Sequence, residues 1–222
     1  MKNNEIITIA IDGPSASGKS TVAKSLAKKL DILFLSTGAI YRAFGLHCKN
    51  LGLNADSSED AEKVSNAHVE VKYENGSQQT YLNGSNVSNL LNNEVIGSYA
   101  SKISKHFIIR KKCVQVQRDI ASNQSMVVDG RDIGSVVLPQ AKFKFYLDAD
   151  VEVRAQRRLL DLQAENPLIT YEDVLNDLKQ RDYNDTTRKL SPLVLCEDAI
   201  KIDSTNLTMD EVLDKFLQII NK

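Results

Sequence analysis

The chain has 222 residues, of which 42% are hydrophobic and 26% charged, and its formal net charge is −1. A chain of this size hides roughly 70 to 75% of its unfolded surface, and its composition excludes a disordered protein. The near-neutral charge argues against a nonspecific binder of nucleic acid or anionic membrane, because such binding needs a dominant basic surface. We therefore expect a globular protein with one main core and no nucleic-acid or membrane partner.

The cysteines and the N-terminal segment indicate the cellular compartment of the protein. Its three cysteines, at positions 48, 113 and 196, are odd in number and lack any metal-binding spacing. The apolar run at residues 6–11 is too short for a signal peptide or a membrane span. We expect a monomer in the reducing cytoplasm.

The first predicted elements are a strand, a glycine-containing turn and a helix. Residues 6–11 form a short apolar run typical of a buried parallel strand. The following helix places one set of apolar side chains on a common face: Val22, Ala23, Leu26, Ala27 and Leu30. Further apolar runs at 32–35, 126–128, 143–147 and 199–202 alternate with helical patterns. This order predicts an α/β fold with a doubly wound, five-stranded parallel sheet.

The pattern changes between residues 69 and 87, where apolar and polar residues alternate. Two Asn-Gly pairs, Asn75-Gly76 and Asn83-Gly84, interrupt this alternation. Asn-Gly favours tight hairpin turns, so the stretch predicts a small antiparallel meander. Because such hairpins do not belong inside a parallel core, we expect an inserted subdomain at residues 62–98, with the core formed by residues 1–61 and 99–222.

The turn after the first strand has the pattern GxxxxGK[ST] at residues 13–20, here called the phosphate loop. Between a strand and a helix, this pattern aims backbone amides and a helix N-terminus at an anion, and glycine lets the backbone approach phosphate closely. Lys19 is expected to reach the β and γ phosphates of a nucleoside triphosphate. The Ser20 hydroxyl is expected to help hold the magnesium ion that accompanies it.

A phosphate loop serves switches, motors and kinases alike, so other residues must choose among them. The Asn-Lys-x-Asp and Asp-x-x-Gly patterns of guanine-reading GTPases do not occur in the sequence. Scattered arginines occur instead, and the arginine fork suits phosphate oxygens. The pattern favours a small P-loop kinase over a signalling GTPase.

Three more segments carry a family resemblance: Ser36-Thr37-Gly38-Ala39-Ile40-Tyr41-Arg42, Asp129-Gly130-Arg131-Asp132-Ile133-Gly134, and Arg181-Asp182 with Asp185, Arg188 and Ser191-Pro192-Leu193. With the phosphate loop, they resemble the bacterial cytidylate kinase family over nearly the whole chain. The sequence departs from the family pattern at Ser36, Ile108 and Asn92.

The resemblance implies that ATP binds the phosphate loop, that CMP or dCMP binds between core and insert, and that an arginine-rich helical lid, about residues 150–190, closes over both. The implied ATP-binding residues are Gly13, Pro14, Ser15, Ala16, Ser17, Gly18, Lys19, Ser20 and Thr21. The implied substrate-binding residues are Thr37, Arg42, Ser101, Arg110, Arg131, Asp132, Arg181, Asp185 and Arg188. The implied catalytic residues are Lys19, Arg131, Arg157 and Arg188.

The family also implies individual roles for these side chains. Arg42 and Arg131 match arginines that hold the acceptor phosphate, and Ser101, Arg110 and Asp132 match the group that reads cytosine. Asp185 matches a carboxylate on the ribose hydroxyls. Arg154, Arg157 and Arg158 match the lid. Apart from the resemblance, we expect Asp129 to orient water on Mg²⁺.

The last group, Arg181, Asp185 and Arg188, has i, i+4, i+7 spacing, which predicts one shared helix face. Two alternatives stay open at this point. One is a P-loop kinase with another acceptor, such as UMP or shikimate. The other is a non-catalytic nucleotide sensor or regulatory ATPase that transfers nothing.

Overall fold

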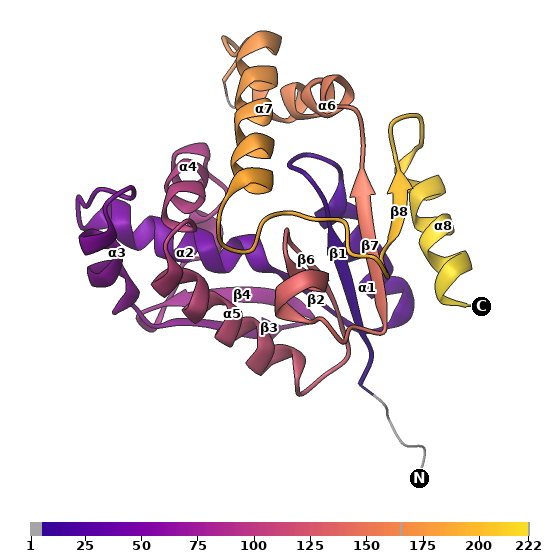
Figure 1. Cartoon of the computed structure of the whole chain (residues 1–222), viewed down its shortest axis with the longest axis horizontal. Coiled ribbons are helices and arrows are strands. Elements are labelled where there is room, and N and C mark those ends of the chain that lie inside the picture. The colour runs from indigo at the N-terminus through magenta and orange to yellow at the C-terminus, as the bar shows by residue number, and fades with distance from the viewer. Residues whose placement is uncertain (1–5, 165, 222) are drawn as a thin grey trace. The chain divides into compact units, whose positions relative to one another are not determined.

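The computed structural model describes residues 6–164 and 166–221. Its contacts divide the chain into two compact units, described separately below. The first unit contains residues 6–8 and 32–128, and the second contains residues 9–31 with the described residues from 129 onward. The helices and strands are labelled in Figure 1.

The main sheet has five strands in the order β2-β6-β1-β7-β8. These strands are β1 (Thr8–Asp12), β2 (Leu33–Ser36), β6 (Met126–Asp129), β7 (Phe143–Asp148) and β8 (Ile200–Asp203). Strand β7 pairs in parallel with β1, where Asp12 is opposite Tyr146, and with β8, where Phe145 is opposite Ile200. The apolar runs named above form the five strands, of which β6 is fully buried and β8 mostly exposed, and the predicted α/β class is confirmed.

The second unit also contains four α-helices: α1 (Lys19–Leu30), α6 (Val151–Gln163), α7 (Tyr171–Thr187) and α8 (Met209–Ile220). Helix α1 buries Val22, Ala23 and Leu26, as its spacing predicts, and packs against α8. Helices α6 and α7 pack against each other around Ala155, Val174 and Leu178. Capping boxes at Thr170 and Thr208 satisfy the first backbone amides of α7 and α8.

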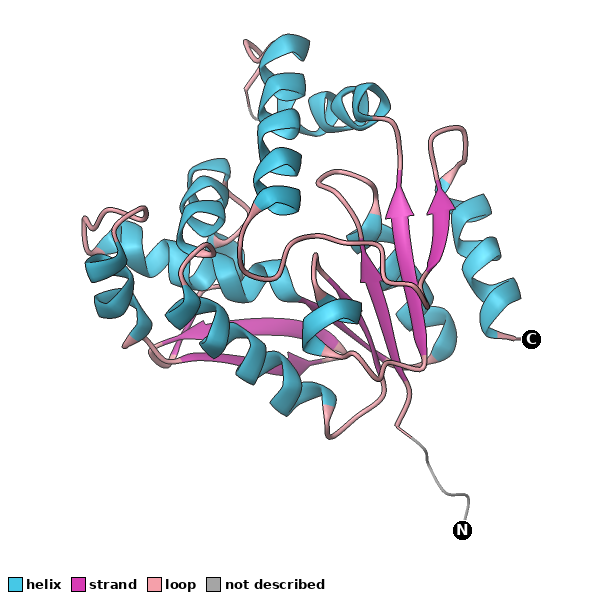
Figure 2. Ribbon diagram, in the orientation of Figure 1, coloured by secondary structure: helices cyan, strands magenta, loops and turns pink. Residues whose placement is uncertain are grey.

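The first unit combines helices with a second sheet, which Figure 2 shows as a group of magenta strands beneath cyan helices. The helices are α2 (Thr37–Asn50), α3 (Ser58–Ser65), α4 (Glu94–Ile103) and α5 (Phe107–Ala121), with a short 3₁₀ turn η1 (Ser88–Leu90). The small sheet contains β3 (Val69–Glu74), β4 (Ser77–Leu82) and β5 (Ser85–Asn86), all antiparallel.

Both Asn-Gly pairs form the turns of this small sheet. Asn75 and Gly76 have φ angles of 50° and 74°, and Asn83 and Gly84 have φ angles of 50° and 84°. Positive φ at both central residues defines the type I′ turn, whose twist matches that of a hairpin. The predicted antiparallel meander is confirmed, whereas the limits 62–98 for an inserted subdomain stay a prediction.

Candidate active site

The phosphate loop leaves the end of β1 through a position that only glycine can occupy. Gly13 has φ of +146°, and a Cβ there would lie 2.0 Å from the carbonyl oxygen of Leu147 on β7. Gly18 has φ of +87° and caps the start of α1. Such backbone angles cost glycine little and other residues a great deal. Strand β1 therefore delivers the loop directly to the N-terminus of α1, where Ser20 and Thr21 are exposed.

Lys19 is the first residue of α1, and its side chain is folded against its own loop. Its Nζ donates to the carbonyl oxygen of Pro14 at 2.5 Å and to the Ser17 hydroxyl at 3.2 Å. Burial lowers the pKa of Lys19 well below its ordinary value, and the neighbouring Arg131 charge acts in the same direction. Nearby carboxylates, led by Asp129, oppose this shift. The carbonyl oxygen of Pro14 and the hydroxyl of Ser17 thus occupy the ammonium group of Lys19, in the place where a triphosphate would bring anionic oxygens.

Ser20 and Asp129 lie side by side, because the Ser20 hydroxyl donates to Asp129 Oδ2. Asp129 ends β6 and is 5% exposed, whereas Ser20 lies at the open first turn of α1. Hydroxyl and carboxylate oxygens are ligands that suit Mg²⁺, which keeps several waters and takes others from substrate phosphate. Across the described residues, no group of three or more His, Cys, Asp or Glu side chains could hold a metal by itself. The pair therefore fits magnesium that arrives with a nucleotide.

A network of arginines and carboxylates connects the phosphate loop to the segment after α7. Arg131 donates from Nε to Asp185 at 2.8 Å and from a terminal nitrogen to the Ser15 hydroxyl at 2.9 Å. Asp185 also accepts from Arg188 at 3.2 Å. Arg188 in turn lies 4.0 Å from Asp132. Residues predicted to bind phosphate, ribose and base thus touch one another within the second unit.

The charge state of Arg131 follows from this network. Burial is the largest single effect and works against the guanidinium charge, but the neighbouring carboxylates, led by Asp185, together raise the pKa of Arg131. The charges of Asp129 and Asp182 act in the same direction. Arg131 is therefore a fixed cation, held between Ser15 of the phosphate loop and Asp185 of α7.

Arg154 lies on α6, within the segment predicted to form the lid, and its side chain binds other protein groups. Its side chain is 6% exposed and pairs with Asp182 at 2.7 Å. It also donates to the carbonyl oxygens of Ala149 and Ser15, at 2.8 and 2.9 Å. Asp182 completes the bridge by accepting from the Ser15 amide at 3.3 Å. Arg154 and Asp182 thus connect α6 and α7 to the phosphate loop.

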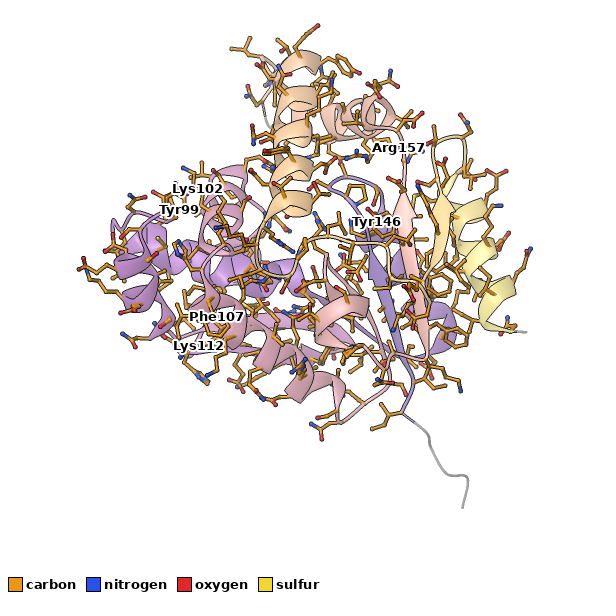
Figure 3. The ribbon with its side chains drawn as sticks, in the orientation of Figure 1. Tyr99, Lys102, Phe107, Lys112, Tyr146 and Arg157 are labelled. Carbon is orange, nitrogen blue, oxygen red and sulfur yellow. The ribbon has the colours of Figure 1, made fainter. Side chains whose placement is uncertain are left out.

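The remaining arginines of α6 and α7 contact protein groups. Arg157, labelled in Figure 3, donates to the carbonyl oxygen of Ser204 at 2.8 Å, in the segment that follows β8. Arg181 pairs with Asp177, one turn earlier on α7, at 2.8 Å. Helix α7 contains Arg181 and Asp185 and ends at Thr187, so Arg188 caps the helix instead of continuing it. The Arg188 side chain still reaches Asp185, at 3.2 Å.

The first unit holds the other predicted substrate-binding residues. Arg42 on α2 donates to the carbonyl oxygen of Leu91 at 2.6 Å, and Thr37 is buried at the start of the same helix. Arg110 on α5 is 4% exposed and donates to the carbonyl oxygen of Ser104 at 3.2 Å. Its guanidinium lies 5.4 Å from the centre of the Tyr41 ring.

Ser101 belongs to α4, one turn before the Ser104 carbonyl that Arg110 contacts, and is half-buried. Asp132, assigned with Ser101 and Arg110 to the base, belongs to the second unit. The residues assigned to the base are therefore divided between the two units. In the first unit these groups surround α2 and α4, which pack closely together.

The comparison with known proteins agrees with the site. A family model described as "Cytidylate kinase" matches residues 9–222. A curated cytidylate kinase of Caldicellulosiruptor saccharolyticus is 45% identical over 97% of this chain and 96% of its own length. Another, from Thermosipho melanesiensis, is 43% identical over 96% of each chain.

This chain belongs to the cytidylate kinase family. The match spans both units, so it includes the phosphate loop, the arginine network and the small sheet. A solved shikimate kinase of Bacteroides thetaiotaomicron is 9% identical, with a TM-score of 0.51 over 98% of this chain and 100% of its own. At that identity the likeness shows only a shared fold.

Several residues of this cytidylate kinase family member were missed by the sequence reasoning. Asp12 ends β1 and accepts from two buried amides. A charged residue at the end of an otherwise apolar strand was the available signal. Asp182 lies inside a segment that was recognised, but no role was assigned to it. Gln78 of β4 exchanges hydrogen bonds with both backbone groups of Ser36, and no sequence pattern predicts that pairing.

Proposed function

We propose that this protein transfers the γ-phosphoryl group of ATP to CMP and dCMP, giving ADP and CDP or dCDP. An acceptor phosphate oxygen attacks the γ-phosphorus while the bond to the β–γ bridging oxygen breaks, so no covalent enzyme intermediate is needed. Family membership supports the substrate class. The observation that carries the proposal is the contact of Arg131 with both Ser15 of the phosphate loop and Asp185 of the arginine network.

On the donor side, Lys19 and the loop amides bind the triphosphate. The Lys19 ammonium exchanges its present partners, Pro14 and Ser17, for phosphate oxygens, whose charge favours its protonated form. Ser20 and Asp129 would hold Mg²⁺ that arrives with ATP, and the ion would neutralise charge on the phosphates. The chain itself thereby fixes the γ-phosphoryl group at the start of α1.

On the acceptor side, Arg131 and Arg188 present guanidinium groups already oriented by Asp185. Preorganised cations of this kind stabilise developing charge without reorganising during the reaction. Asp132 accepts from the exocyclic amine of cytosine, and Arg42, Thr37, Ser101 and Arg110 complete the acceptor contacts. The segment with Arg157 and Arg181 closes over the substrates and excludes water, which protects ATP from hydrolysis.

We further propose that the enzyme acts as a cytoplasmic monomer, with neither nucleic acid nor membrane as a partner. Its net charge of −1 supports the absence of a polyanion partner. Among residues 6–164 and 166–221, no helix has the length and apolar content needed to cross a bilayer.

The test is an ADP-release panel in which each nucleoside monophosphate and shikimate is added to the protein with ATP and Mg²⁺. We expect release with CMP and dCMP, and its loss on chelation of the metal. A response to UMP of similar size would broaden the acceptor class. No release with any acceptor would instead support a regulatory nucleotide-binding protein.

A further inference from the structure

Asp12 is a buried carboxylate that has no role in the proposed binding of ATP or CMP. It is the last residue of β1, immediately before Gly13, and is 5% exposed. Its two oxygens accept separately from the amides of Ile133 at 2.9 Å and Gly134 at 2.8 Å. These amides lie 121 and 122 positions further along the chain, so the side chain joins two distant segments.

The two amides come directly after two residues assigned to the acceptor. They begin the short helix η2 (Ile133–Val137), and Arg131 and Asp132 immediately precede them. Residues 130–134, here called the acceptor loop, leave the end of β6 at Asp129. The position of this loop therefore sets the positions of Arg131 and Asp132.

The acceptor loop is tightly packed where it contacts Asp12. Ile133 is fully buried. A Cβ at Gly134 would lie 3.2 Å from Lys144 Cδ and 3.5 Å from Asp12 Oδ2. Lys144 and Asp12 therefore border Gly134 closely, and little space remains there for a larger side chain.

The carboxylate is kept at this position against an electrostatic cost. Burial raises the pKa of Asp12 to about 6, and Asp132 acts in the same direction, while the two amides and Lys19 oppose the shift. Tyr146 and Cys196 also lie within electrostatic range of Asp12. In return, the charge of Asp12 raises the pKa of Lys19 against the effect of burial.

We propose that Asp12 is a positioning residue for phosphoryl transfer, which holds the acceptor loop against the strand that carries the phosphate loop. One side chain would then set the distance between the donor loop and the pair Arg131 and Asp132. Asp12 itself contacts neither substrate in this role. The inference rests on the proposed function, because it assigns Arg131 and Asp132 to the acceptor.

Asp12→Asn tests this role, since asparagine keeps the shape but turns an N–H group toward one of the two amides. We expect kcat to fall roughly 10- to 100-fold, as for a small displacement of reacting groups. The KM for CMP should rise about tenfold, whereas the KM for ATP should change less than about threefold, because the internal contacts of the phosphate loop remain. A purely structural role would lower the folded fraction, and hence kcat, without changing either KM.

The matched control is Asp60→Asn. Asp60 also accepts from a backbone amide, that of Asn54 at 3.0 Å, but it belongs to α3 and has no assigned role in the site. We expect its KM values and kcat to match those of the wild type. If Asp12→Asn does not fold, Gly134→Val provides the second variant, because its branched side chain extends beyond a Cβ that already lies 3.2 Å from Lys144 Cδ and 3.5 Å from Asp12 Oδ2. Its KM for CMP should rise several-fold.

The outcomes separate this inference from the proposed function. A wild-type enzyme that releases ADP with CMP, together with an unchanged KM for CMP in the folded variants, would overturn the role of Asp12 alone. A wild-type protein that releases no ADP with CMP would overturn the proposed function as well.

Discussion

The phosphate loop and the arginine network differ in how far apart their contacting residues lie in the chain. Lys19 bonds to Pro14 and Ser17, which are five and two positions away. Arg131 bonds to Asp185 and Ser15, which are 54 and 116 positions away. The lysine contacts inside the loop therefore depend on nearby sequence, whereas the network depends on the fold that brings its members together. The donor side needs the fold as well where Ser20 meets Asp129, which lies 109 positions away.

The largest expected effect is that of Lys19→Met, which tests the local region. We expect kcat to fall by about 10³-fold, because a preorganised cation at the transferring phosphate is lost. The free energy of unfolding should not decrease, since methionine removes a buried charge from a site where burial already opposes it. Steady-state kinetics and denaturant unfolding check the two statements. Turnover close to the wild-type value would contradict the role of the loop lysine.

Arg131→Lys tests the long-range region. A lysine cannot reach Ser15 and Asp185 with two directed groups, so we expect kcat/KM for CMP to fall by about 10²-fold. Arg118→Lys is the control, because Arg118 is an exposed residue of α5 to which no role in the site is assigned. Initial rates over a range of CMP concentrations measure both. Equal losses in the two variants would remove the distinction between the network and a surface arginine.

The pH dependence of the free energy of unfolding tests Asp12, which joins β1 to the acceptor loop. The pKa of Asp12 is about 6 in the folded protein against 3.8 as the ordinary value. The folded state then binds more protons between these values, so this group adds stability as pH falls from about 6 toward 4. Relative to Asp12→Asn, the wild type should gain on the order of 2 to 3 kcal/mol across that window. Urea unfolding at several pH values measures the difference, and a constant difference would contradict the raised pKa.

The smallest expected effect is that of Asp132→Asn, which sharpens the acceptor side of the network. Asparagine keeps an acceptor oxygen but loses the charge that faces Arg188. Under the proposed function, the same charge faces the cytosine amine. We expect the KM for CMP to rise about tenfold, within the range of one weakened charged hydrogen bond. The KM for ATP in the same variant is the internal control. Equal rises in both would place Asp132 outside the acceptor site.

The same contrast explains how much the sequence could predict. The strands, the two Asn-Gly turns and the phosphate loop depend on local patterns, and all were predicted. The spacing of Arg181, Asp185 and Arg188 predicted one helix face, but it could not show that α7 ends at Thr187 and that Arg188 caps the helix. Nor could spacing show that Arg154 is buried against Ser15, or that Asp12 accepts from Ile133 and Gly134. Those contacts arise only when distant strands and helices assemble.

The most direct test of the central claim follows a labelled phosphoryl group from donor to acceptor. The protein is mixed with Mg²⁺, CMP and a substoichiometric amount of ATP labelled at the γ-phosphate, and products are separated after one turnover. Direct transfer in a water-excluding site predicts label in CDP and little in inorganic phosphate. Label that appears in inorganic phosphate at the same rate with or without CMP would contradict the account.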